Sequence, residues 1–156
     1  MKTINSSTLT DMTVSMLERT AMMLAEPAPE GDVQPAPTRF ARITYSGPSN
    51  GTVVLGATEG FLRELAASLL GVEPAEVDVN THGNDALKEM ANIVGGSMIL
   101  ALSGEVCEYS LGLPELTTVP TPAPAATPAT NAECTVVTDG GPLHVLWRDD
   151  RVKLAA

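Results

Sequence analysis

The sequence predicts an α+β fold in which one antiparallel sheet carries helices on one of its faces. Three observations predict it: amphipathic helical runs, short β-prone runs separated by turn residues, and a hairpin signal near the end of the chain. With 156 residues, 44% of them apolar, the chain has the length of one domain that buries its core without disulfides or metal. We therefore expect a single domain over residues 1–156.

The first predicted element is an amphipathic helix over residues 7–25, with Ser7 or Thr8 as its N-cap. Its apolar side chains recur at helical spacing, namely Leu9, Met12, Met16 and Met23. Residues 26–38 follow with four prolines, which cannot continue a helix or join the interior of a sheet. This segment is predicted to be an extended linker.

The middle of the chain predicts a hairpin and then a helix. Residues 39–46 and 52–57 are β-prone and flank the turn sequence SGPSNG. Residues 59–70 place Phe61, Leu62, Leu65 and Leu69 on one side of a helix, and Gly71 follows as its C-cap.

A longer helix is predicted over residues 84–102, with Thr81 or Asn84 as its cap. Beyond it we expect a strand at 106–113 that Pro114 ends, and a second Pro/Ala-rich segment at 118–130 that loops out of the domain. The sequence DGGP then predicts a hairpin with strands at 134–138 and 143–148, and a final strand is expected at 152–154.

Charge and composition exclude several classes of function. Nine Lys and Arg against nineteen Asp and Glu give a net charge of −10, with no basic stripe, so nucleic acid and anionic membranes are unfavourable partners. The N-terminal residues lack the apolar core of a secretory signal, and the apolar run at 98–102 is too short to cross a bilayer, so we expect a cytoplasmic protein with no membrane insertion.

Neither the cysteines nor the histidines predict a metal centre. In a reducing compartment Cys107 and Cys134 are expected to be free thiols. The two histidines are His82 and His144, and no metal-binding motif accompanies them, so we expect no metal bound by the chain itself. His82 is interpreted as a surface loop residue.

The helix over residues 84–102 has a polar stripe. With Asp85 set at zero and about 100° per residue, Glu89 lies near 40°, Asn92 near 340° and Gly96 near 20°. Apolar side chains occupy the opposite side, which predicts that the stripe faces outward. Gly95 and Gly96 each cost roughly 1 kcal/mol of helix stability relative to alanine, which fits close approach of a partner or of a neighbouring helix equally well.

These residues resemble the signature of the CheC/CheX/FliY chemotaxis phosphatases. The resemblance rests on Asp85-xxx-Glu89-xx-Asn92, the continuation NIVGG, the downstream Pro114 and the upstream FLRELAASLLG. Members of that family hydrolyse the aspartyl phosphate of response-regulator receiver domains, CheY above all, without a covalent intermediate or a metal of their own.

The resemblance implies roles for two residues of the stripe, Asn92 and Glu89. Asn92 would enter the receiver's active site and align the attacking water, and Glu89 would pair with the receiver lysine beside the phosphate. Asp85 and Gly96 would support this site, and Mg²⁺ would sit on the phosphorylated CheY-like partner. Side-chain amides orient water well, so the residue types suit the chemistry.

The resemblance is to the single-site CheX type, because Glu64 in the earlier helix is followed at the matching position by Ala67. CheX-type members are usually dimeric, so a homodimer is expected. Two other interpretations stay open. One is a non-catalytic module of the same fold that docks on a receiver or a motor-switch component. The other, less favoured because basic flanks are absent, is an interaction domain whose Pro-rich segments bind partners.

Overall fold

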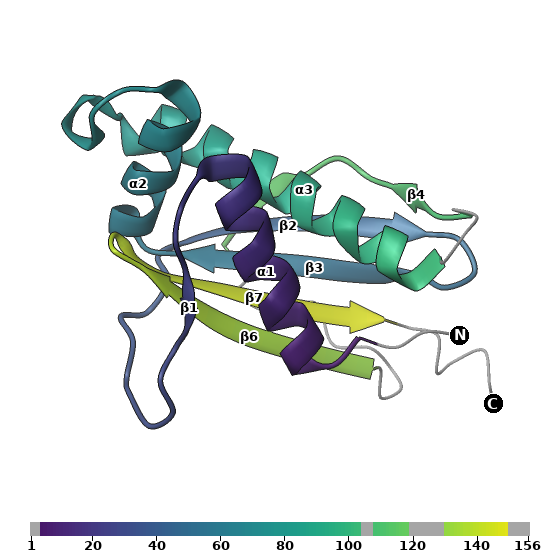
Figure 1. Cartoon of the computed structure of the whole chain (residues 1–156). Helices are drawn as coiled ribbons and strands as arrows, with labels where there is room; N and C mark the ends of the chain where they lie inside the picture. Colours follow the sequence, from purple (N-terminus) through teal and green to yellow (C-terminus); the bar gives the residue numbers. More distant parts are fainter. Residues whose placement is uncertain (1–3, 104–107, 119–129, 150–156) are drawn as a thin grey trace.

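The computed structural model describes residues 4–103, 108–118 and 130–149 of the chain. It has two layers, an antiparallel sheet and three helices that all cover the same face of that sheet (Figure 1). The predicted α+β fold is thereby confirmed. The helices are α1 (Ser6–Ala21), α2 (Glu59–Leu70) and α3 (Asn84–Ser103), with a 3₁₀ turn η1 (Pro74–Glu76) and a π-helical turn η2 (Val79–Gly83) before α3.

The sheet has the order β1-β6-β7-β3-β2-β4, and β5 also pairs with β2. Its strands are β1 (Glu26–Pro27), β2 (Arg39–Ser46), β3 (Gly51–Ala57), β4 (Ser110–Leu111), β5 (Glu115–Thr117), β6 (Thr130–Thr138) and β7 (Gly141–Asp149). Every pair is antiparallel, and the two predicted hairpins, β2–β3 and β6–β7, meet where β3 pairs with β7. The pairing of β3 with β7 therefore forms the centre of the sheet.

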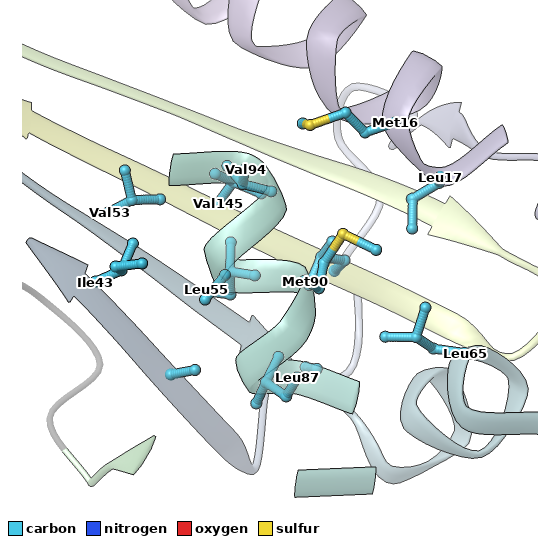
Figure 2. Close-up of a cluster of buried hydrophobic side chains, with 14 of the residues drawn as sticks. Met16, Leu17, Ile43, Val53, Leu55, Leu65, Leu87, Met90, Val94 and Val145 are labelled. Atoms are coloured by element: carbon cyan, nitrogen blue, oxygen red, sulfur yellow. The ribbon is translucent and has the colours of Figure 1, made fainter. Parts of the chain in front are cut away.

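The core lies between the helices and the sheet and is largely aliphatic. Figure 2 shows Leu87, Met90 and Val94 of α3 among side chains of the sheet and of the other two helices. All three are 0% exposed. One side of α3 is thus fixed in the core, which decides which side faces solvent.

A buried hydrogen-bond network links the strands at one end of the sheet. The Tyr45 hydroxyl donates to Oδ2 of Asp149 at 2.5 Å, and Trp147 Nε1 donates to the same hydroxyl at 2.8 Å. Ser49 Oγ donates to Asp149 Oδ2 at 2.8 Å. These bonds join β2, the β2–β3 turn and β7, and they satisfy polar groups that would be costly to bury alone.

The first helix differs from its prediction at both ends. Asn5 caps it, with its Oδ1 accepting the backbone N–H of Thr8 at 2.8 Å, so neither Ser7 nor Thr8 is the N-cap. The helix ends at Ala21 because Met22 adopts the left-handed conformation, with φ of 54°. Met23 is still buried, although it lies beyond the helix.

Two predicted segments also differ, and one strand was not predicted. The predicted linker starts with β1, a two-residue strand at the edge of the sheet, where proline is tolerated. The strand predicted over 106–113 is reduced within the described residues to β4, and Pro114 is followed by β5, which was not predicted. β4 and β5 both pair with the outer edge of β2. The backbone N–H and C=O groups at that edge need hydrogen-bond partners, and a neighbouring extended segment supplies them.

Some predictions fall outside the described residues, namely Cys107, most of the Pro/Ala segment (119–129) and the strand at 152–154. Cys134 is a free thiol and is buried. Burial raises the pKa of the Cys134 thiol above its usual value, which keeps it protonated and unreactive. No helix in the described ranges has the length and hydropathy needed to cross a membrane.

Candidate functional site

Helix α3 presents its polar stripe to solvent. Asp85, Glu89 and Asn92 are exposed, and Gly96 is partly exposed, as the helical spacing predicts. The opposite side is buried through Ala86, Leu87, Met90, Ala91, Val94, Gly95, Met98, Ile99 and Leu102. The structure therefore brings the four predicted site positions together on one surface.

The two adjacent glycines of α3 have different surroundings. A Cβ at Gly95 would lie 2.9 Å from Cγ2 of Ile43 and 3.0 Å from Cδ1 of Leu111, so this glycine lets α3 pack closely on the sheet. A Cβ at Gly96 would meet nothing within 4 Å. The core thus explains Gly95, whereas Gly96 leaves open space beside Asn92.

The start of α3 is held by Arg39 of β2. Its guanidinium donates to Oδ1 of Asn80 at 2.7 Å and to Oδ1 of Asn84 at 3.2 Å, and it also contacts Glu59 of α2 at 3.3 Å. Asp78 caps the turn η2, and its carboxylate accepts the backbone N–H of Asn80. These contacts tie the sheet, α2 and η2 to the first turn of α3, and so fix the direction in which the stripe points.

The side chains of Glu89 and Asn92 are unengaged within the described part of the chain, where no hydrogen bond or ion pair holds either of them. Asp85 has one contact, an exposed ion pair with Nζ of Lys88 at 3.7 Å. Exposed pairs of this kind contribute about 0–1 kcal/mol. All three side chains can therefore take a new partner at little cost.

A hollow of about 290 Å³ adjoins the stripe, and the sequence did not predict it. Its lining residues come from α2, η2 and α3: Ala66, Leu69, Leu70, His82, Asp85, Ala86 and Glu89. His82 was interpreted as a surface loop residue, and it is exposed, but it lies in η2 and lines the same hollow as Asp85 and Glu89. Only the pairing of α2 with α3 in space brings these residues together, so no signal in the sequence marked them.

Glu64 of α2, the acidic residue at the position matching a second site, has a structural role. Its Oε2 accepts the hydroxyl of Thr138 at 2.7 Å and the backbone N–H of Gly140 at 2.6 Å. The carboxylate therefore holds the β6–β7 turn. With Ala67 buried where an amide would be needed, α2 offers no second acid–amide pair.

The stripe is chemically suited to a few tasks. An exposed carboxylate such as that of Glu89 binds a cation presented by a partner. An amide such as that of Asn92, one turn further along, has two donors and an acceptor with which to orient water or phosphoryl oxygens. Among the residues described, no group of three or more His, Cys, Asp and Glu side chains could hold a metal ion.

Fold and site together define an α+β protein that exposes an acidic and an amide side chain one turn apart on a helix. The sequence profile of the family described as chemotaxis phosphatase CheX matches residues 39–136, more than half of the chain and including the whole stripe. The chain belongs to the CheX family. A search of curated protein sequences found no significant match.

Solved structures agree with this assignment at the level of the fold. Chemotaxis protein CheX from Vibrio vulnificus aligns with a TM-score of 0.72 and 15% identity, covering 91% of this chain and 96% of that one. A CheX from Desulfovibrio desulfuricans gives a TM-score of 0.69 and 17% identity, with the same coverage. The Borrelia burgdorferi CheX–CheY–BeF₃–Mg²⁺ complex gives 0.62 and 13% identity, covering 90% and 94%.

Proposed function

We propose that this protein is a phosphatase that hydrolyses the aspartyl phosphate of a CheY-like receiver domain, with Glu89 and Asn92 as its catalytic pair. The observation that carries the proposal is the exposure of both side chains on one face of α3, with no partner in the described part of the chain. The match to the CheX family and the CheX–CheY complex among the similar folds support it. With a CheY-like substrate we also propose a cytoplasmic location.

Hydrolysis of an acyl phosphate requires few catalytic groups from the phosphatase. An acyl phosphate has a good carboxylate leaving group, and Mg²⁺ on the receiver neutralises the charge that develops on the phosphoryl oxygens. Positioning a water in line with the phosphorus is what remains, and the Asn92 amide can hold that water by a hydrogen bond. Glu89 pairs with a receiver lysine, which fixes the depth and angle at which Asn92 enters.

The test follows loss of phosphate from a phosphorylated CheY-like receiver with Mg²⁺ present. Wild-type protein should accelerate the loss, and Asn92→Ala should lower kcat on the order of 10²-fold, because the water is no longer aligned. Asn50→Ala is the matched control, since Asn50 is an exposed amide in the β2–β3 turn, far from α3 in the sequence. Equal turnover by wild type and Asn92→Ala would contradict the mechanism.

Glu89→Gln separates docking from chemistry. Removing the charge should raise the KM for the receiver severalfold, because a lysine loses its counter-ion. Glu18→Gln, an exposed carboxylate on α1, is the control and should behave as wild type. Tight receiver binding by the wild-type protein without any acceleration would instead identify a non-catalytic docking module.

A further inference from the structure

The hollow beside the stripe has two kinds of wall. Figure 1 shows α2 next to the start of α3. The hollow is lined by side chains of these two helices and of η2. Leu69 and Leu70 of α2 supply an apolar wall and are 38% and 54% exposed. Asp85 and Glu89 of α3 supply an acidic wall, and both carboxylates are exposed.

His82 also lines the hollow. Its Nδ1 accepts the backbone N–H of Asp78 at 3.2 Å, which fixes the orientation of the ring. Lys88 is paired with Asp85 only at 3.7 Å and at the surface, so it can be displaced by another cation.

The hollow is continuous with the catalytic pair. Glu89 lines the hollow and also belongs to the stripe, and Asn92 follows it by one helical turn, a rise of roughly 4.5 Å. A partner that covers Asn92 and Glu89 therefore also covers the hollow. A group that binds in the hollow therefore needs an apolar part to pack on the leucines and a cationic part to pair with the carboxylates.

We propose that the hollow binds a basic side chain of the receiver, additional to the lysine that pairs with Glu89 in the proposed function on which this inference rests. A lysine or arginine has a long aliphatic stem and a charged head, so the stem can lie against Leu69 and Leu70 while the head reaches Asp85. The net charge of −10 also attracts a partner with a basic surface. The hollow is thus a specificity subsite that selects receivers carrying a basic residue at this place.

The test measures binding of the beryllofluoride–Mg²⁺ form of a CheY-like receiver to the full chain. Leu70→Ser and Asp85→Asn should each weaken binding about fivefold or more, because one removes the wall for the stem and the other the partner of the head. Asp85→Asn should also reduce the salt dependence of the affinity. Thermal unfolding of each variant checks that it folds.

Matched controls lie elsewhere on the molecule. Leu24→Ser removes a leucine that is 80% exposed beyond the end of α1, and Asp11→Asn removes an exposed carboxylate on α1. Both should bind as wild type does. Replacing the exposed lysines and arginines of the receiver one at a time, in double-mutant cycles with Asp85→Asn, should find one that couples to Asp85.

The outcomes distinguish the two proposals. A wild-type protein that binds no receiver overturns the proposed function and this inference with it. A wild-type protein that binds and hydrolyses while Leu70→Ser and Asp85→Asn retain wild-type affinity overturns the hollow alone. Loss of affinity in Leu70→Ser only, with no receiver residue coupled to Asp85, shows an apolar occupant and also overturns the assignment of a basic side chain.

Discussion

At the scale of single residues, Gly95 and Gly96 show how adjacent positions on one helix serve different purposes. Both lower the intrinsic stability of α3 by roughly 1 kcal/mol relative to alanine. Only Gly95 is required by the core, because Ile43 and Leu111 lie against its Cα. Gly96 has no such neighbour within the described residues, and its cost to the helix is consistent with close approach of a partner beside Asn92.

This contrast can be measured with a pair of alanine substitutions. Gly96→Ala should stabilise the protein by about 1 kcal/mol, whereas Gly95→Ala should be less stable than Gly96→Ala by about 1–3 kcal/mol, because its methyl group overpacks the core. Urea unfolding gives both values. If a receiver approaches Gly96 closely, Gly96→Ala should also raise the KM for that receiver, and an unchanged KM would show that the space there is not used.

The residues of the stripe could be predicted because helical periodicity is local. Asp85, Glu89 and Asn92 lie on one face whatever packs on the other, so their exposure follows from spacing alone. His82 could not be placed in the same way, because the π-helical turn before α3 changes the angle per residue and the hollow needs α2 as its second wall. The sequence therefore predicted the stripe but not the hollow beside it.

At the scale of elements, α2 is bound to the β6–β7 hairpin as well as to α3. Glu64 holds the turn of the hairpin, and Gly60 and Gly140 are so close that a side chain at either would collide with the backbone of the other. Thr58 caps the same helix by accepting the backbone N–H of Phe61. The acidic residue of α2 thus stabilises the connection between a helix and the sheet.

Glu64→Ala should therefore reduce stability and leave catalysis unchanged. The substitution leaves the Thr138 hydroxyl and the Gly140 N–H without this acceptor, which we expect to cost about 1–3 kcal/mol of the free energy of unfolding. Chemical denaturation measures the loss, and receiver dephosphorylation at saturating substrate measures kcat. A marked fall in kcat in a folded Glu64→Ala protein would place a second site on α2.

The helices and the central strands were more predictable than the strands at the sheet edges. Both hairpins carry turn sequences, and α2 has Gly71 in the left-handed conformation, as predicted for its C-cap. β1, β4 and β5 are two or three residues long and form where extended chain passes a free edge of the sheet. Such pairing depends on neighbours distant in the sequence, which local propensity does not encode.

At the scale of the whole molecule, β6 lies near one edge of the sheet, and among the described residues its outer side is only partly covered. β1 pairs with it only at Val136 and Val137, although Glu133 and Thr135 also make single outward hydrogen bonds to Ser6 and Ala28. The other edge consists of the short strands β4 and β5. An outer edge of this kind can pair with a second copy of the chain.

We predict a homodimer that uses this edge of β6. Sedimentation equilibrium should give twice the chain mass of 16.2 kDa. Asn131 is two residues before Glu133, so its backbone N–H points to the same outer side of β6 as that of Glu133. Asn131→Pro removes this donor and should shift the equilibrium toward monomer. A wild-type protein of monomeric mass at micromolar concentration would contradict the dimer, and a dimer unaffected by the proline would place its interface elsewhere.

The pairing at the centre of the sheet also governs how the chain can fold. Gly51 pairs with Asp149 and Ala57 with Leu143, so α2 and α3 both lie in the loop that this contact closes. Closing a long loop costs entropy before the contacts repay it, and proteins with many such contacts fold slowly. Until the β6–β7 hairpin joins β3, the apolar face of α1 lacks the strand β6 on which it packs, and this exposed apolar surface favours aggregation.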